Sequence, residues 1–225
     1  PSIPDFGACA EISDALKVFL VSASPARFPN APPEAPPSSW GVGIATECGR
    51  VRTQNQDFGL AFRVAGCDVV CLADGLGGLP RGRDAARIAV AAAAWSAVQT
   101  LQAPEAKDLP SLVSEKALLD AAAALVAAGI RDRISSSSDG LRTTLIVLTA
   151  TPKALGLAYA GDGGGLVVHA NGKEETLLQP QKANGQANVV TTSLGPILQG
   201  EPQVVLVQRQ RGDVVLLGTD GVFDR

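Results

Sequence analysis

The chain has 225 residues, a net charge of −3 and a hydrophobic content of 46%. This length allows one domain, or at most two small ones, with enough apolar residues to bury a substantial core. No cluster of lysine and arginine follows the pattern of a nucleic-acid-binding surface, so we expect no nucleic-acid partner. No apolar run is long enough to span a membrane, and no basic segment precedes the apolar residues 18–21, so we predict a cytoplasmic protein without membrane contact.

The first 39 residues are interpreted as an N-terminal extension. Residues 11–21 have the composition of a short helix or strand, and the six prolines of residues 25–39 predict an irregular connector. The composition changes at Trp40, and residues 40–225 are predicted to form the main domain.

Three strands, separated by polar turns, are predicted first in this domain, at 40–46, 57–64 and 68–73. The third is almost continuously apolar, which is typical of a strand covered on both faces. It runs into the glycine-rich segment 74–78, where the backbone can approach a ligand closely. Two helices follow, at 82–101 and 111–130.

Strands return in the second half of the chain, with glycine-rich turns at 161–165 and 171–172 between them. They are predicted at 143–150, 154–160, 165–170, 189–193, 203–208 and 213–219. These strands follow one another too closely for helical crossovers. The order of strands, two helices and more strands therefore predicts an α+β domain with antiparallel sheets.

The cysteines stand at positions 9, 48, 67 and 71, without a C-x-x-C pair or a nearby histidine, which argues against a zinc site. Cys67 and Cys71 are four residues apart on a predicted strand, so they share a face and are interpreted as small core residues in a reducing compartment. The single histidine, His169, has no catalytic partner nearby in sequence, and a structural or exposed role is favoured.

Three aspartates stand where predicted strands meet glycines: Asp57 follows Asn55-Gln56, Asp74 precedes Gly75, and Asp220 precedes Gly221. An Asp-Gly pair alone is typical of a turn, so the hypothesis rests on their joint pattern. Carboxylate oxygens are the ligands that Mg²⁺ and Mn²⁺ prefer, and the chain offers no set of histidines or cysteines for a softer metal.

Two such metal ions can share a bridging water and stabilise an in-line displacement at phosphorus. An arginine nearby would hold the phosphoryl group, and Arg52, five residues before Asp57, is the candidate. Most other arginines of this region lie around the start of the first predicted helix. For Arg50, Arg81, Arg83 and Arg87 we favour solvation of the helix start or pairing with Asp84 over phosphate binding.

Three motifs in this order resemble the type 2C metal-dependent serine/threonine protein phosphatases, in particular the compact bacterial members. They are RTQNQD at 52–57, LADGLGG at 72–78 followed by Gly82, and LLGTDGVFD at 216–224. The resemblance covers about residues 40–224. It implies a central antiparallel β-sandwich flanked by α-helices and identifies residues 40–225 as a phosphatase domain.

The resemblance also implies a role for each matched residue. Asp57 would bind the metal cluster, Asp74 would bridge two Mn²⁺ or Mg²⁺ ions, the Gly75 carbonyl would be a ligand, and Asp220 would hold the other side. Arg52 would bind the substrate phosphate. The expected reaction is hydrolysis of phosphoserine and phosphothreonine in proteins by a hydroxide bridging the two ions, in opposition to a serine/threonine kinase.

Some positions depart from the family pattern. Leu76 stands where some members have a proposed general acid, Gln56 removes a negative charge, and Gly163-Gly164 replace the usual Ser-Arg. The flap segment at about 170–190 is short, and the late Asp-Asn motif would lie beyond residue 225. These departures leave a second function open, a pseudophosphatase that binds a phosphoprotein or regulator without turnover. A third is a phosphatase for a small phosphorylated molecule.

Overall fold

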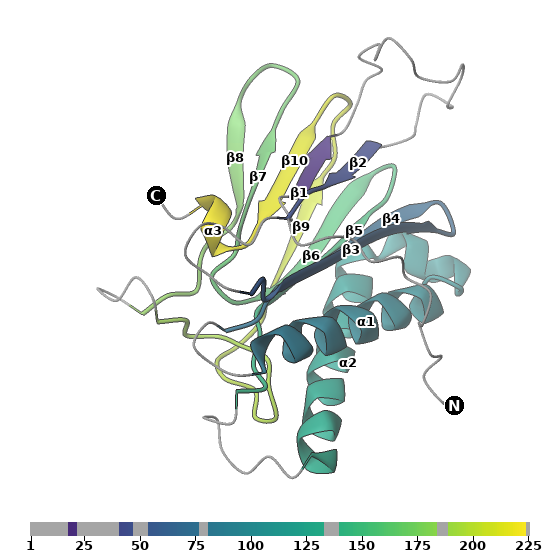
Figure 1. The fold of residues 1–225 in the computed structure, drawn as a ribbon. Coiled ribbons are helices and arrows are strands. Elements are labelled where there is room, and N and C mark those ends of the chain that lie inside the picture. The colour runs from purple at the N-terminus through teal and green to yellow at the C-terminus, as the bar shows by residue number, and fades with distance from the viewer. Residues whose placement is uncertain are drawn as a thin grey trace.

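Antiparallel pairing organises the chain into two five-stranded sheets that pack face to face (Figure 1). The computed structural model describes residues 18–21, 41–46, 54–76, 81–132, 140–183 and 189–223. The strand order of the first sheet is β2 (Gly41–Ile44), β1 (Val18–Val21), β10 (Val214–Gly218), β7 (Gly164–Val168) and β8 (Glu174–Leu178). That of the second is β3 (Asp57–Val64), β4 (Cys67–Asp74), β5 (Leu145–Ala150), β6 (Ala154–Ala160) and β9 (Gln203–Gln208).

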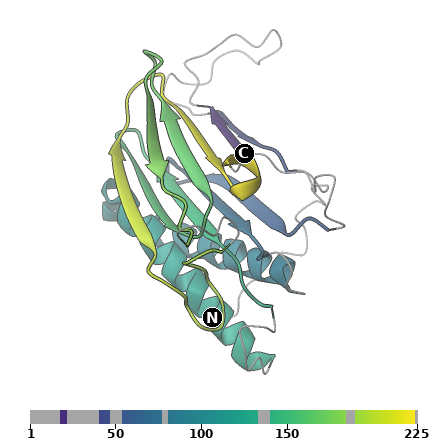
Figure 2. The same ribbon diagram turned by 90° about the vertical axis from the view of Figure 1, so that its left-hand side faces the viewer.

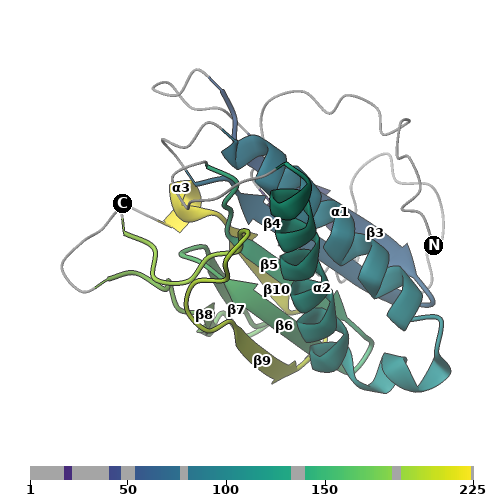
Figure 3. The same ribbon diagram turned by 90° about the horizontal axis from the view of Figure 1, so that it is seen from below.

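Two long helices cover the outer face of the second sheet (Figure 3). Helix α1 (Gly82–Thr100) lies on β3 and β4, and α2 (Pro110–Arg131) lies mainly on β5 and β6, with its side against β9. The short 3₁₀ helix η1 (Pro104–Asp108) joins them, and α3 (Asp220–Phe223) follows β10. Both long helices face the sheet and each other with buried alanines at helical spacing, which lets their backbones approach closely.

Strand β4 is buried on both faces, which confirms the interpretation of its apolar run. Val69, Cys71 and Ala73 belong to the core under the helices, whereas Val70 and Leu72 belong to the core between the two sheets. The alternation follows from the two-residue period of a strand. Asp74, the last residue of β4, therefore lies on the face that is turned towards the other sheet.

A two-residue turn at Ala65 and Gly66 sets the register of β3 against β4. Both residues have positive φ, 53° for Ala65 and 82° for Gly66, as a type I′ hairpin turn requires. Pairing then runs without a shift from Val64 opposite Cys67 to Asp57 opposite Asp74. Because a one-residue slip would turn each side chain to the opposite face, this turn determines which residues of β3 lie beside Asp74.

The fold class predicted from the sequence, an α+β domain with antiparallel sheets packed against helices, is confirmed. Strand β8 was not predicted, because its first three residues are charged or polar and exposed. The strand predicted at 189–193 is wrong: the described residues there form only isolated bridges, Lys182 with Val190 and Ser193 with Gln199.

Part of the expected N-terminal extension belongs to the first sheet, since β1 pairs with β2 and β10. The remainder of residues 1–39, including the proline-rich connector, lies outside the described residues, and the domain division at residue 39 stays a prediction. No helix in the described part of the chain is both long and apolar enough to cross a membrane.

Cys67 and Cys71 are buried free thiols in the core under the helices, as predicted, and burial raises the pKa of Cys71 to about 12. Cys9 and Cys48 lie outside the described residues.

His169 links the end of β7 to the start of β10. Its Nδ1 lies 2.9 Å from Oδ1 of Asp213, which is 1% exposed, and its Nε2 lies 3.5 Å from Oε2 of Glu175. The second Asp213 oxygen accepts a hydrogen bond from the Gln210 backbone N–H at 2.8 Å. The hydrogen bond with Asp213, aided by Glu175, raises the pKa of His169 against the effect of partial burial. A structural role for the only histidine of the chain agrees with these contacts.

We expect the stability contributed by His169 to depend on pH. Its folded-state pKa lies above the unfolded value of about 6.5, so the contribution is fully present below that pH and is lost as the pH rises through the folded-state pKa. The Hε1 resonance of this single histidine should titrate with a midpoint above that of a free imidazole. The free energy of unfolding should fall across the same pH range in the unmodified chain and not in His169→Gln. An unshifted midpoint would contradict the role given to Asp213.

Candidate active site

Two of the three predicted aspartates meet at the end of the β3–β4 hairpin. Asp57 and Asp74 are directly opposite in the ladder, so their side chains project from the same face. Asn55 fixes the approach to β3, because its Oδ1 accepts a hydrogen bond from the Asp57 backbone N–H at 3.0 Å. The Asn55 amide in turn donates to Oγ1 of Thr46 at 2.8 Å.

The third aspartate, Asp220, is supplied by the other sheet. Strand β10 ends at Gly218, and Thr219 and Asp220 follow at the edge where the β3–β4 pair ends. The hydroxyl of Thr219 donates a hydrogen bond to Oδ2 of Asp57 at 3.2 Å. This bond links the two sheets next to the carboxylates. Sequence reasoning missed Thr219, although a polar β-branched residue between an apolar strand and Asp220 was a usable signal.

Asp74 lies between the other two carboxylates. Its carboxyl group is within hydrogen-bonding range of both Asp57 and Asp220. Burial, followed by the charges of Asp57 and Asp220, raises the pKa of Asp74 well above its usual range. The structure thus brings together the three aspartates that are far apart in sequence.

The donor set at this site suits a hard divalent cation. It consists of carboxylate oxygens, and a cation between them would relieve the repulsion that adds to the effect of burial on the pKa of Asp74. Within the described residues, no group of three or more aspartate, glutamate, histidine or cysteine side chains already converges as a set of metal ligands. The carboxyl groups of Asp57 and Asp220 are instead each linked to Asp74. The residues therefore fit a metal by their chemistry, and the three carboxylates would have to move closer together when a metal binds.

The backbone of Asp74 is held by the start of the neighbouring strand. Its carbonyl accepts hydrogen bonds from Oγ1 of Thr143 and from the backbone N–H of Thr144, both at 2.8 Å. Its own N–H donates to Oγ1 of Thr144 at 3.0 Å. The two threonines therefore leave the end of β4 little freedom.

Gly75 and Gly82 bring two backbone segments into direct contact beside the carboxylates. A Cβ on Gly75 would overlap the backbone of Gly82, and a Cβ on Gly82 would lie 2.9 Å from the Gly75 carbonyl carbon. The N–H of Gly75 also donates to the Gln56 carbonyl at 3.1 Å. The start of α1 is thereby held against the residue that follows Asp74.

Helix α3 is positioned by a glycine at the start of β7. The ring of Phe223 lies over Gly164, and a Cβ on Gly164 would overlap this ring. A Cβ on Gly163 would lie 2.8 Å from the Gly218 carbonyl oxygen. Gly163 and Gly164, which depart from the family pattern, therefore provide the space in which α3 and Asp220 sit.

Arg142 is a buried residue near the site that the sequence analysis did not single out. It is 6% exposed, and its guanidinium donates to Oγ of Ser193 at 3.3 Å and to the Ile197 carbonyl at 3.1 Å. Burial lowers its pKa. Its own carbonyl accepts the N–H of Leu76 at 3.0 Å, so Arg142 connects the segment at 193–197 to the residues after Asp74.

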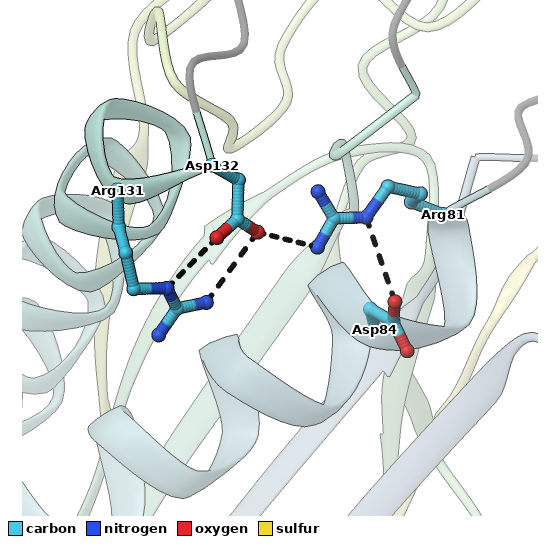
Figure 4. Close-up of polar contacts among 4 residues, drawn as sticks. All are labelled: Arg81, Asp84, Arg131 and Asp132. Atoms are coloured by element: carbon cyan, nitrogen blue, oxygen red, sulfur yellow. Dashed lines mark hydrogen bonds and ion pairs between the residues drawn. The ribbon is translucent and has the colours of Figure 1, made fainter.

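A surface ion-pair network connects the start of α1 to the end of α2 (Figure 4). Arg81 contacts Asp132 at 2.7 Å and Asp84 at 3.5 Å, and Arg131 contacts Asp132 at 2.8 Å. Hydrogen bonds from Arg131 and then Arg81 lower the pKa of Asp132 to about 2. Pairing of Asp84 with one of four arginines was expected, and Arg81 is the one that contacts it. The second partner of Arg81, Asp132, lies 51 residues away and was not expected.

Arg52, the predicted phosphate ligand, lies outside the described residues, as do Gly77 and Gly78. Their roles therefore stay predictions.

We expect Gly75→Ala to destabilise the fold by about 1–3 kcal/mol, the usual cost of overpacking, because its methyl group would overlap backbone that cannot rotate away. Gly82→Ala should cost less, since its closest contact of 2.9 Å demands a smaller shift. Denaturant unfolding of both variants checks the order. Equal stability of Gly75→Ala and the unmodified chain would contradict the close contact.

Comparison with known proteins shows the relationships of the chain. A family model described as protein phosphatase 2C matches residues 45–225. Among solved structures, the serine/threonine phosphatase of S. agalactiae is 21% identical, with 78% of this chain and 77% of that chain covered and a TM-score of 0.62. The catalytic domain of the phosphatase PstP, solved with 2 manganese ions, is 23% identical over 77% of this chain and 74% of that chain, with a TM-score of 0.59.

PppA of Pseudomonas aeruginosa is 26% identical over 78% of this chain and 74% of that chain, with a TM-score of 0.54. No curated protein sequence matches. The structural likenesses at 21% and 23% identity show the shared fold. The family model matches residues 45–225, from just after β2 onwards, and spans each of the three aspartates. The chain therefore belongs to the protein phosphatase 2C family.

Proposed function

We propose that the chain hydrolyses phosphoserine and phosphothreonine in proteins, with Asp57, Asp74, Asp220 and the Gly75 carbonyl holding two Mn²⁺ or Mg²⁺ ions. The observation that carries the proposal is the meeting of three carboxylates, supplied by three strand ends in two sheets, around Asp74. When bound, the ions would supply an activated water and neutralise the phosphoryl charge. The PstP catalytic domain, which shares the fold, was solved with 2 manganese ions.

The described residues would contribute mainly by holding these ligands in place. Thr219 orients Asp57 through its hydroxyl, and Thr143 and Thr144 hold the backbone of Asp74. Metal ligands that are already oriented lose less freedom on binding, and the residues that orient them influence metal affinity.

Arg52 would bind the phosphoryl group of the substrate through its planar guanidinium. Its place in the chain, five residues before Asp57, supports this role. The phosphorylated protein substrate, and the kinase that this activity would oppose, belong to the same proposal and follow from family membership.

The alternative is a pseudophosphatase that binds a phosphoprotein or regulator without turnover. Leu76, the residue after Gly75, favours this alternative, because its side chain has no proton to donate to the leaving group. Gln56 also lacks the negative charge expected at its position. The replacement at Gly163-Gly164 gives this alternative less support, since packing against Phe223 and Gly218 accounts for both glycines.

Hydrolysis of an aryl phosphate and of a phosphothreonine peptide should require Mn²⁺ or Mg²⁺ and should fall by about a hundredfold or more in Asp74→Asn. Mn²⁺ should also raise the unfolding temperature of the unmodified chain and raise it less in this variant. Asp84→Asn, the same change at an exposed site on α1, is the control and should alter neither measurement. Full turnover in Asp74→Asn would overturn the assignment of the site. No turnover, with retained binding of the phosphopeptide, would favour the pseudophosphatase.

Arg52→Ala should raise KM for the phosphopeptide by about tenfold, the size expected for the loss of a charge-assisted hydrogen bond. Arg52→Lys should recover only part of this loss, because an ammonium group cannot bind phosphate through two parallel hydrogen bonds. Steady-state kinetics at saturating Mn²⁺ measure the effect. An unchanged KM in Arg52→Ala would show that another residue binds the phosphate.

A further inference from the structure

Strand β9 lies at the edge of the second sheet, next to β6 (Figures 2 and 3). In the described part of the chain, β6 is its only strand partner. An edge strand presents unpaired N–H and C=O groups along its outer side and is a template for another strand.

The hydrogen-bond pattern shows which residues of β9 face outwards. The N–H of Arg209 donates to the Lys153 carbonyl at 2.9 Å, so the backbone of Arg209 points towards β6. Backbone groups alternate sides along an antiparallel strand. Val204, Leu206 and Gln208 therefore direct their N–H and C=O groups away from the sheet.

This edge lacks the protection that natural edge strands usually carry. The sequence of β9 is QVVLVQ, without a charged residue or proline, and it has high β-propensity. Val204 is 43% exposed and Leu206 is 57% exposed. Both lie on the side of the sheet that carries α2, which contacts β9.

The charges that flank β9 favour a second copy of the same strand as the partner. Glu201, exposed, precedes the strand, and Arg209 and Arg211 follow it. The Arg209 guanidinium donates to the Thr151 carbonyl at 3.2 Å, whereas Arg211 is exposed. Antiparallel pairing of two copies would place Glu201 of each opposite Arg211 of the other. Parallel pairing would place like charges together.

Pro202 limits the register. It lies two residues before Val204, in the row of residues that faces outwards, and it has no N–H to donate. A register centred on Leu206 pairs Val204 with Gln208 of the other copy and uses each outward N–H and C=O of the strand. A shift by two residues, centred on Val205, would pair Gln208 with Pro202 and leave a Gln208 carbonyl without a donor.

We propose that two copies of the chain associate through antiparallel pairing of their β9 strands, centred on Leu206. The second sheet of one copy and that of the other would then form one continuous sheet. Val204 and Leu206 of both copies would lie on the face that carries the helices. Leu112, Leu119 and Val126 of α2, each seven residues from the next and partly exposed, would border this apolar strip.

Sedimentation equilibrium of the chain over a range of concentrations should show a monomer–dimer equilibrium. Leu206→Lys should raise the dimer dissociation constant by about tenfold or more, because it places two like charges opposite each other at the centre of the pairing. Val42→Lys is the matched control: Val42 is an exposed valine on β2, the edge strand of the other sheet, and its replacement should leave the constant unchanged.

Val204→Pro provides a second variant, since it removes an N–H that points away from β6 and leaves the ladder with β6 intact. It should also weaken the dimer, while the circular dichroism spectrum stays that of the unmodified chain. Amide hydrogen exchange adds a residue-level readout. The amides of Val204, Leu206 and Gln208 should be protected in concentrated solution and exchange on dilution, whereas those of Val205 and Val207 should stay protected throughout.

Three results would overturn the proposal. One is a monomer at concentrations up to about 1 mM, the weak end of specific association. Another is a dimer that both Leu206→Lys and Val204→Pro leave intact. The third is a dimer that Val42→Lys disrupts instead, which would move the interface to β2.

Discussion

The arrangement of the candidate active site depends on the register of one hairpin. Ala65 and Gly66 form a two-residue turn with positive φ at both positions, and unbroken pairing from this turn places Asp57 opposite Asp74 at the far end of the strands. The same register directs Phe58 and Ala73 towards the helices and Leu72 towards the other sheet. A slip by one residue would therefore separate the carboxylates and also expose part of the core.

The site gathers three carboxyl groups around Asp74. Burial raises the pKa of Asp74, and the charges of Asp57 and Asp220 on either side add to this effect. The surrounding packing holds this unfavourable arrangement in place: threonines bind the backbone of Asp74, Gly75 contacts Gly82, and Phe223 rests on Gly164. Repulsion between neighbouring carboxylates is what a divalent cation would relieve, and carboxyl groups with perturbed pKa values are found more often at functional sites than elsewhere.

Much of the fold could be predicted from local pattern. The apolar run of β4 at residues 69–73 and the alanine periodicity of α1 and α2 reflect burial, which can be recognised from the sequence pattern. The short spacing of the later strands indicates antiparallel connections. The failures have physical reasons. Strand β8 begins with exposed Glu174 and Glu175, and the β-branched residues at 189–193 meet no continuous partner strand. The three aspartates were predicted from their glycine neighbours and the family motifs. Arg142 and Asp132 act through partners that are distant in sequence, which no local pattern encodes. Thr219 had a local signal, but its partner Asp57 lies 162 residues away.

The two faces of β4 serve different purposes, and this separation bears on how such a chain can diverge. Residues that point to the helices need only fill volume, and cores accept many combinations of aliphatic residues when total volume is kept. Residues at the end of the opposite face carry the carboxylates. Substitutions can therefore accumulate in the core under the helices without changing the carboxylates of the candidate site. The S. agalactiae phosphatase, at 21% identity over 78% of this chain, still shares the fold with a TM-score of 0.62.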